Sequence, residues 1–368
     1  MSKVGIITLN GYFNFGNRLQ NYALQRFLKN LDSNIYSETI WYEKLSLKLD
    51  EKLTRYVNIR NYVFNKHGFR KFINSGRYMF DVIREYNFKK FNDRYINSAF
   101  DYKIKKDLND RYDYFIVGSD QVWNPHYVNL KNEFLQFADR NKRIAYAASF
   151  GVSEIKHDKF DIVKKGLEGI DYISVREQAG AKIIRELTGK DVPVLVDPTL
   201  LLTVEEWEKV MERPAWYKDE KYILVYFLSK MPDKIKKDIN ELAKLYNLQI
   251  IDLTNNANID YYCSPPSEFL YLIKNCSLMY TDSFHGTVFS ILNKRPFVTC
   301  SREGGMNMDS RIDTLLSMFN LQSRKISKEN NYEFANPMEI EYPDVEAILD
   351  RERQCSKEFL CKALNIKE

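Results

Sequence analysis

The sequence has few of the side chains that bind metals or form disulfides. Its 368 residues include five cysteines and four histidines. The cysteines are an odd set with no CxxC pair, and all of them lie after residue 260. These features argue against a disulfide framework and against a zinc site, and we expect no metal. They are typical of a cytoplasmic protein with reduced thiols.

A long hydrophobic run is also missing. No apolar stretch approaches the roughly 18–20 residues of a transmembrane helix. The apolar segment Val4–Leu9 near the start is too short for a signal peptide. Apolar residues make up 44% of the chain and charged residues 29%, which excludes disordered, collagenous and coiled-coil proteins. We therefore expect a globular cytoplasmic protein whose length suggests two domains.

Strand-like and helix-like patterns alternate along most of the chain, which predicts parallel sheets covered by helices. Expected strands are Val4–Leu9, Tyr114–Val117, Arg143–Phe150, Tyr172–Val175, Val192–Val196, Tyr222–Leu228, Gln249–Asp252, Leu278–Thr281 and Phe297–Cys300. Expected helices are Arg18–Leu31, Glu177–Leu187, Val204–Arg213, Asp233–Tyr246, Glu268–Asn275, Gly286–Asn293, Ser310–Phe319 and Asp344–Leu364. The fold class is α/β, with two Rossmann-like domains at 1–202 and 203–368. Their ligand cleft is expected between the domains, at the carboxyl ends of the strands.

One segment of the first domain stands out by its charge. Residues 44–106 contain 16 Lys/Arg and 6 Asp/Glu, although the whole chain has a net charge of only +5. The apolar residues of this segment have helical spacing, which predicts a basic insertion of two or three amphipathic helices. Such helices can contact an anionic membrane surface, or they can cover a sheet and present a solvated basic face. No nucleic-acid recognition module is present.

The first polar motif lies between the first strand and the first helix, at Asn14–Asn21. Asn17 can cap the helix, and Arg18 with the free N–H groups of a helix N-terminus can hold an anion. The motif is not GxGxxG, so a dinucleotide fingerprint is absent. A capped turn without a ligand is the alternative.

A second motif follows the buried strand Tyr114–Val117 and includes Ser119, Asp120 and Gln121. A carboxylate fixed at a strand end, beside amide donors, suits a general base or an acceptor for sugar hydroxyls. The alternative is that Asp120 only caps a turn. Arg176 also follows a strand, and its guanidinium can bind a carboxylate or phosphate through two hydrogen bonds.

The most informative motif joins the strand Leu278–Thr281 to the next helix. Here Ser283, His285, Gly286 and Thr287 place hydroxyls, backbone N–H groups and one titratable ring at a helix N-terminus, which predicts a phosphate pocket. Arg311 begins a later helix and can reach the cleft or pair with a neighbouring acid. Asp197 can hydrogen-bond a ligand or stabilise the joint between the domains, and the joint is the favoured interpretation.

Taken in order, these segments resemble the polysaccharide pyruvyl transferase family. The resemblance covers most of the chain and is carried by NFGNRLQNYAL, FIVGSDQVW, AYAASFG, ISVRE, VLVDPTLLL, TDSFHGTVFSILNKRPFV and SRIDTLL. It implies a GT-B-like fold. It also implies transfer of pyruvate from phosphoenolpyruvate to two hydroxyls of a sugar in a bacterial surface glycan precursor, with phosphate released and no cofactor.

The resemblance implies that Arg176 holds an anionic group of phosphoenolpyruvate and that His285 contacts the phosphate or acts as general acid. Asp120 would then be the base, and Arg18 or Arg311 a second clamp. Many family members have an arginine two residues before the histidine, whereas this chain has Ser283. Two alternatives remain open: a GT-B glycosyltransferase that uses a nucleotide sugar, and a non-catalytic glycan- or anion-binding protein. The acceptor can be lipid-diphosphate-linked, which would suit a membrane contact through 44–106.

Overall fold

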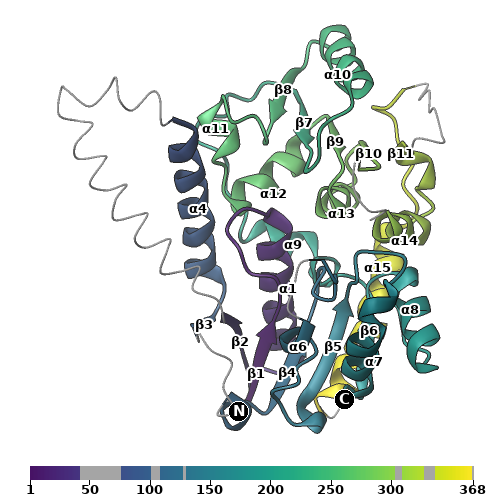
Figure 1. Cartoon of the computed structure of the whole chain (residues 1–368). Helices are drawn as coiled ribbons and strands as arrows, with labels where there is room; N and C mark the ends of the chain where they lie inside the picture. Colours follow the sequence, from purple (N-terminus) through teal and green to yellow (C-terminus); the bar gives the residue numbers. More distant parts are fainter. Residues whose placement is uncertain (42–75, 101–107, 127–129, 303–308, 327–335, 367–368) are drawn as a thin grey trace, which may run out of the picture.

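The computed structural model describes residues 1–41, 76–100, 108–126, 130–302, 309–326 and 336–366. Two parallel sheets, each flanked by helices, form two domains that lie one above the other in Figure 1. The predicted α/β fold with two Rossmann-like domains is therefore confirmed. No helix in the described part of the chain is long and apolar enough to cross a membrane.

The first sheet has six parallel strands in the order β3-β2-β1-β4-β5-β6. Their bounds are Ser2–Ile7 (β1), Ile35–Trp41 (β2), Ser98–Phe100 (β3), Tyr114–Val117 (β4), Arg143–Ala148 (β5) and Tyr172–Val175 (β6). β1 pairs with both β2 and β4, so the strand order reverses beside it. The carboxyl ends of parallel strands beside such a reversal form the usual ligand crevice of this architecture.

The helices of the first domain connect these strands. They are α1 (Phe15–Leu31), α4 (Gly76–Tyr95), α5 (Leu108–Arg111), α6 (Leu130–Glu133), α7 (Phe160–Glu168) and α8 (Gln178–Thr188), with 3₁₀ turns η1 (Arg140–Lys142), η2 (His157–Lys159) and η3 (Pro198–Leu200). α8 ends where Gly189 adopts a left-handed backbone with φ of 73°. Glycine takes up this conformation without a steric penalty, so the helix ends there.

The second sheet has five parallel strands in the order β11-β10-β9-β7-β8. They are β7 (Tyr222–Tyr226), β8 (Gln249–Asp252), β9 (Leu278–Thr281), β10 (Phe297–Cys300) and β11 (Lys325–Ile326). The helices are α9 (Val204–Glu208), α10 (Asp233–Leu245), α11 (Ile259–Tyr262), α12 (Pro266–Asn275), α13 (Phe284–Leu292), α14 (Ser310–Met318), the turn η4 (Gln322–Arg324) and α15 (Val345–Ala363). The order reverses beside β7, and the carboxyl edge at such a reversal is the position where sheets of this kind usually bind a ligand.

A continuous apolar core joins the two domains around α1. Phe15 at the start of α1 stacks on Phe269 of α12, with ring centroids 4.2 Å apart and an interplanar angle of 9°. Phe15 also stacks on Phe88 of α4 at 5.0 Å. Side chains of both domains belong to this one buried cluster. The site between the sheets is therefore held by a shared core as well as by the connecting chain.

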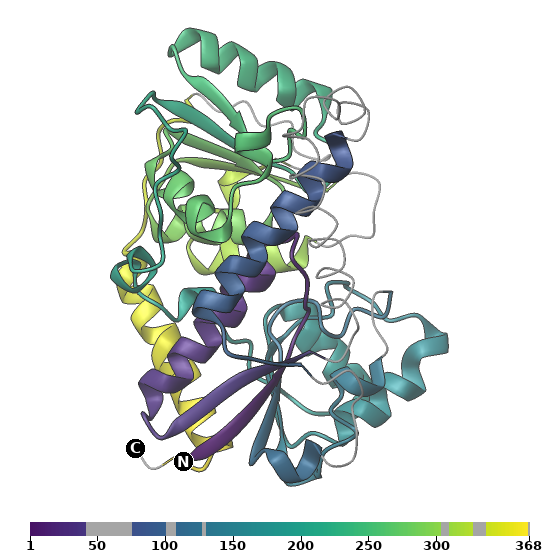
Figure 2. The same ribbon diagram turned by 90° about the vertical axis from the view of Figure 1, so that its left-hand side faces the viewer.

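The final helix α15 returns to the first domain, although its residues follow the second sheet in sequence (Figure 2). Phe359 lies 6.3 Å from Tyr146 of β5, measured between ring centroids. Arg353 donates hydrogen bonds to the carbonyls of Leu200 and Leu202. The chain segment 203–368 therefore supplies the second sheet and also covers part of the first.

Several elements differ from the sequence-based expectations. β2 and β3 were not predicted, and β3 lies within the segment expected to be helical. The expected strand Val192–Val196 is reduced to a single bridge between Val194 and Val175. The basic segment is described only as α4 and β3, so the predicted helices within 44–75 lie outside the described residues.

Candidate active site

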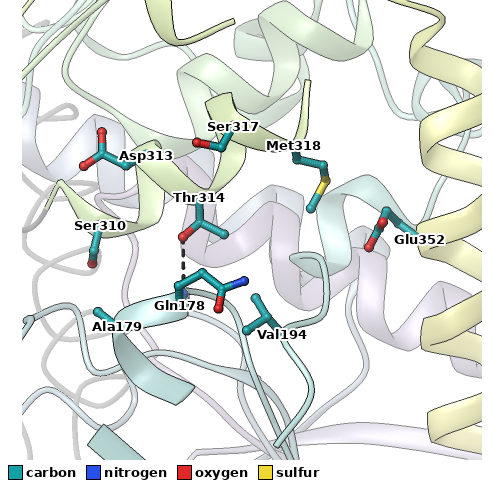
Figure 3. Close-up of a pocket in the computed structure, with 9 residues that line it drawn as sticks. All are labelled: Gln178, Ala179, Val194, Ser310, Asp313, Thr314, Ser317, Met318 and Glu352. Carbon is teal, nitrogen blue, oxygen red and sulfur yellow. Dashed lines mark hydrogen bonds between the residues drawn. The ribbon is translucent and has the colours of Figure 1, made fainter. Parts of the chain in front are cut away.

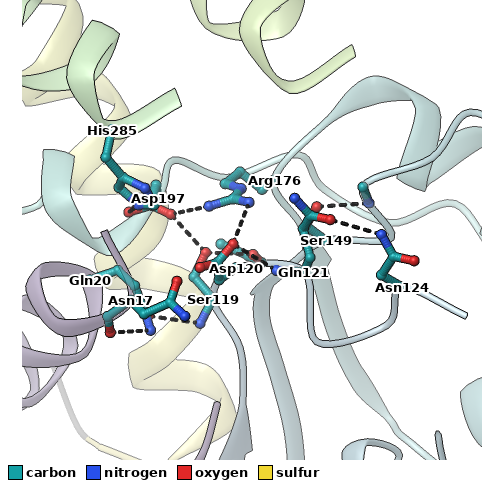
Figure 4. A network of polar contacts seen from close by, with 12 residues as sticks. Asn17, Gln20, Ser119, Asp120, Gln121, Asn124, Ser149, Arg176, Asp197 and His285 are labelled. Atoms are coloured by element: carbon teal, nitrogen blue, oxygen red, sulfur yellow. Dashed lines mark hydrogen bonds and ion pairs between the residues drawn. The ribbon is translucent and has the colours of Figure 1, made fainter. Parts of the chain in front are cut away.

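The polar motifs meet where the carboxyl edges of the two sheets face each other. The loops after β4 and β6 supply Ser119, Asp120 and Arg176, and η3 begins directly after Asp197. The loop after β9 and the start of α13 supply His285 from the second domain. Figure 4 shows these side chains pointing toward one another. Residues up to 166 positions apart in sequence thus form one buried polar network.

Asp197 lies at the centre of this network. One of its oxygens, Oδ2, accepts hydrogen bonds from Arg176 Nη1 at 2.5 Å and from Ser119 Oγ at 2.9 Å. The other, Oδ1, accepts from the backbone N–H of Thr199 at 3.0 Å and from its hydroxyl at 2.7 Å. Burial would raise the pKa of Asp197, but His285 and Arg176 outweigh it and hold the pKa well below its ordinary value. Asp197 is therefore a carboxylate at neutral pH.

Arg176 connects Asp197 to Asp120. Its Nη2 lies 3.4 Å from Asp120 Oδ1, and its guanidinium carbon lies 4.5 Å from the centroid of the Phe284 ring. Asp120 adopts a left-handed backbone with φ of 68°, a conformation that aspartate tolerates better than most residues. Burial lowers the pKa of the Arg176 guanidinium, but Asp197 and Asp120 more than offset this and the pKa is raised. The cation is thus retained in a site where water is excluded.

His285 enters the network from the N-terminus of α13. Its side chain is buried, and its Nε2 lies 3.6 Å from Asp197 Oδ1. The ring packs on Gly16 in the first turn of α1, where an added Cβ would overlap the imidazole. The absence of a side chain at Gly16 therefore allows α1 of the first domain and α13 of the second to close around the histidine.

Two nitrogen donors of this site remain without a hydrogen-bond partner among the described residues. They are Nε of Arg176 and Nε2 of His285, and both atoms are buried. Leaving a buried donor unsatisfied costs about 1–3 kcal/mol, so most such groups in folded proteins are paired. His285 Nε2 lies 3.6 Å from Asp197 Oδ1, too far for a hydrogen bond, and Arg176 Nε has no acceptor in the described part of the chain either, so a ligand between these neighbouring side chains can supply acceptor oxygens.

Arg311 of α14 adds further positive charge beside Arg176. Burial and the neighbouring Arg176 lower the pKa of the Arg311 guanidinium to about 10. Glu177 lies behind these arginines and accepts hydrogen bonds from Ser149 Oγ and the N–H of Phe150, both at 3.0 Å. The two guanidinium groups come from different domains and repel each other, so an anion between them would relieve that repulsion.

Other predicted site residues form the frame of the second-domain motif. The Ser283 side chain caps α13 by accepting a hydrogen bond from the N–H of Gly286 at 3.3 Å. Thr287 is fully buried and its hydroxyl donates to the carbonyl of Ser283. Gly286 lies against Met279 and Thr281. These contacts orient the N-terminus of α13, and His285 is the member of this motif that reaches the polar network.

The residues predicted from the first motif are placed differently. Asn17 does not cap α1, because the helix begins at Phe15 and Asn14 holds the cap position; the capping prediction is wrong. Arg18 is buried and donates to Asn92 Oδ1 at 2.9 Å and to the carbonyl of Leu9 at 3.0 Å. Its guanidinium therefore connects α4 to the loop between β1 and α1 through hydrogen bonds, and it does not bind Asp197.

The second motif is brought into the site in part. Ser119 is buried and donates to Asp197, so it supports the carboxylate from the first domain. Gln121 accepts a hydrogen bond from Asn124 at 2.8 Å, and its N–H donates to Asp120 at 2.9 Å. The central role of Asp197 was missed, although its position directly after a buried apolar segment was a usable signal. The described residues contain no cluster of His, Cys, Asp and Glu that could hold a metal ion.

Comparison with known proteins supports the interpretation of these motifs. The family model for polysaccharide pyruvyl transferase matches residues 14–304 of this sequence. This chain belongs to the polysaccharide pyruvyl transferase family. The match includes every predicted site residue except Arg311, and it supports a transferase enzyme. No curated protein matches the sequence.

The chain is similar to several solved structures at low sequence identity. UDP-N-acetylglucosamine 2-epimerase from Rickettsia bellii is 10% identical with a TM-score of 0.50, and the match covers 99% of this chain and 97% of that one. The epimerase from Neisseria meningitidis bound to UDP-GlcNAc is 10% identical, covers 100% and 95%, and has a TM-score of 0.44. The Escherichia coli heptosyltransferase WaaC with ADP is 9% identical, covers 96% and 99%, and has a TM-score of 0.39. This member of the pyruvyl transferase family therefore has a two-domain, GT-B-like fold.

Proposed function

We propose that this pyruvyl transferase takes pyruvate from phosphoenolpyruvate and attaches it to two hydroxyls of a sugar in a bacterial surface glycan precursor. The observation that carries this proposal is the pair of unsatisfied buried donors on Arg176 and His285, next to the cation of Arg311. Phosphoenolpyruvate carries its carboxylate and its phosphate on the same carbon atom. These two anions match two cationic positions that come from opposite domains.

The network supplies the charges that ketal formation needs. The methylene carbon of phosphoenolpyruvate must gain a proton while the first sugar hydroxyl adds to the neighbouring carbon. Phosphate then leaves through an oxocarbenium-like state, and the second hydroxyl closes the ketal. One hydroxyl proton ends on the new methyl group and the other on the released phosphate, so the reaction needs no oxidant or cofactor.

His285 is the proposed proton donor because its buried imidazole enters the site from α13 and its Nε2 lies 3.6 Å from the Asp197 carboxylate. Asp120 is the proposed base, and Arg176 holds its carboxylate in place from 3.4 Å. Arg176 and Arg311 stabilise the charge that develops on the phosphate. Ser283 replaces the arginine found in many family members, and Arg311 is the proposed substitute for that charge.

A ligand-binding measurement tests the donor. The melting temperature is measured with phosphoenolpyruvate and with a panel of nucleotide sugars, for wild type, Arg176→Lys and Arg311→Gln. Phosphoenolpyruvate at about 100 times its Kd adds about 2.7 kcal/mol to the stability of wild type, and this gain should shrink in both variants. Stabilisation by a nucleotide sugar but not by phosphoenolpyruvate would replace the proposal with a glycosyltransferase.

The proton donor is tested by turnover. His285→Gln replaces the imidazole with an amide of similar size that cannot donate a proton as an acid. Phosphate release in the presence of acceptor should therefore fall by about 10²–10⁴-fold. Asn293→Ala, at the far end of α13, is the matched control and should retain turnover. Turnover of His285→Gln near the wild-type rate would exclude this role.

A further inference from the structure

A cavity of about 610 Å³ lies between the domains, beside the polar network. Figure 3 shows it between the start of α8 in the first domain and one face of α14 in the second, with α15 at its far end. Gln178 lies two positions after Arg176, and Ser310 directly precedes Arg311. The cavity therefore adjoins the segments that carry both proposed clamps, yet the proposed chemistry does not use it.

The lining of the cavity is polar and not cationic. Nine described residues line it, and none of them is a lysine, arginine or histidine. The six polar ones are Gln178, Ser310, Asp313, Thr314, Ser317 and Glu352. The carboxylate of Asp313 already pairs with Lys325 at 2.6 Å and that of Glu352 with Arg351 at 3.4 Å. The nine lining residues supply no cation for an anionic ligand. Hydroxyl, amide and carboxylate side chains together suit a ligand with many neutral hydroxyls.

Two details of the hydrogen bonding favour an occupied site. Ser310 Oγ is buried without a hydrogen-bond partner among the described residues. Among the residues drawn in Figure 3, one hydrogen bond joins the two domains: the N–H of Gln178 donates to Thr314 Oγ1 at 3.3 Å. Gln178 of the first domain and Ser310 of the second line the same space, so both domains can contribute to binding one ligand.

We propose that this cavity binds a neutral saccharide unit of the acceptor glycan, adjacent to the unit that receives pyruvate. Its volume lies within the range of about 300–1,000 Å³ that is usual for small-ligand pockets, and it has room for more than a single ring. The role as acceptor subsite rests on the proposed function, whereas saccharide binding itself does not. Because both domains line the cavity, glycan binding here also fixes the relative position of Arg176 and Arg311.

A variant that fills the cavity tests this proposal. Ser317 is exposed on α14, so Ser317→Trp can occupy the cavity without disturbing the core, and Ser317→Ala is the matched control. The probe is an array of neutral and uronic-acid-containing bacterial oligosaccharides, followed by titration of the best binder in solution. Wild type and Ser317→Ala should bind neutral oligosaccharides, and Ser317→Trp should lose at least about tenfold in affinity.

The melting-temperature gain with phosphoenolpyruvate is measured for the same three proteins and should be equal in all of them. Loss of glycan affinity in Ser317→Trp without any phosphoenolpyruvate effect in wild type would support the saccharide site and reject the proposed donor. Equal glycan affinity in wild type and Ser317→Trp, a preference for acidic oligosaccharides, or no binding to the array would overturn the saccharide site.

Discussion

Two buried charged regions join the domains, and they differ in how their charges are neutralised. In the network around Asp197, arginine and carboxylates pair directly. Beside α4, Arg84 is also buried, but it donates to the backbone carbonyls of Leu253, Tyr262 and Phe13 and forms no ion pair among the described residues. Its guanidinium lies over the rings of Phe15, Phe88 and Tyr262.

The ion pair at the centre of the network and the two ionisable groups of the α4 contact respond in opposite directions. The pKa of Arg176 is raised by its two carboxylate partners, whereas burial lowers the pKa of Arg84. The pKa of Asp197 is lowered, whereas burial raises the pKa of Glu268 on α12 to about 7. Ionic charge is thus retained in the network where chemistry is proposed, and it is disfavoured in the contact that only joins the domains.

The largest expected effect comes from breaking the network at its centre. Asp197→Ala leaves the Arg176 cation with one weaker partner in a buried site and should lower the free energy of unfolding by about 3–5 kcal/mol. Because the folded-state pKa of Asp197 is lowered, its contribution is present above its ordinary pKa and lost as the pH falls. Urea unfolding at neutral and acidic pH measures both effects.

Asp171→Ala is the matched control, since it breaks an exposed pair with Arg140. This change should leave stability almost unaltered because water screens such pairs. Equal losses in Asp197→Ala and Asp171→Ala would remove the distinction between the buried network and the surface.

The second prediction concerns the unpaired carboxylate of the α4 contact. Burial, with a smaller contribution from Glu212, raises the pKa of Glu268 from 4.5 to about 7, while a bond from Ser264 opposes it. The folded protein therefore holds this proton more tightly than the unfolded chain. The resulting stability is complete below pH 4.5 and disappears as the pH rises through about 7.

Glu268→Gln stays neutral, so it should remove this pH dependence, which amounts to at most about 3 kcal/mol. Unfolding free energies of wild type and variant between pH 4 and 8 measure the difference. Glu241→Gln on the exposed face of α10 is the control. Parallel pH profiles for wild type and Glu268→Gln would show that the carboxylate is ionised when buried.

The third prediction tests the cation of the same contact. Arg84→Met keeps much of the apolar packing but removes the hydrogen bonds to three backbone carbonyls. The expected loss is about 2 kcal/mol, smaller than for Asp197→Ala, because the variant leaves no buried charge behind. Thermal or urea unfolding measures it, with Lys90→Met on the exposed face of α4 as control. A loss larger than that of Asp197→Ala would reverse the comparison.

The last prediction concerns Gly16, where a modest change in stability should accompany a clear effect on activity. A Cβ at this position would overlap the His285 ring, and such overpacking costs about 1–3 kcal/mol. Gly16→Ala should therefore displace the imidazole and reduce kcat by at least about tenfold. Gly11→Ala is the control, since nothing lies within 4 Å of its added Cβ. Equal kcat values for the two variants would show that the position of the His285 ring set by Gly16 does not matter for catalysis.

Sequence reasoning recovered the elements whose local pattern is strong. The apolar runs that became β4, β6 and β9 were predicted with their observed bounds, and α15 nearly so. β2 was missed because Ser37, Glu38 and Thr39 interrupt its apolar pattern. These polar side chains are buried in the structure, and Thr39 accepts a hydrogen bond from Gln25 of α1 at 2.9 Å. Only a partner distant in sequence makes such a strand stable.

The site was predicted in part for the same reason. His285, Asp120 and Arg176 follow buried strands, and residues at strand ends of a parallel sheet meet at one edge whatever their separation in sequence. Arg18 has the same local setting, but the structure commits its guanidinium to Asn92 and the Leu9 carbonyl. The identity of the side chains was visible in sequence, whereas their partners were not.

The sequence by itself determined the α/β class, the two domains and the motifs at the strand ends, because these depend on local periodicity and residue type, and the order of those motifs carried the resemblance to the family. Only the tertiary structure decided that Asp197 is the centre of the network and that α15 covers the first sheet. It also decided which buried arginines are paired with carboxylates. Such outcomes depend on desolvation and on contacts between residues far apart in sequence, and the energy of a buried charge is set by those contacts.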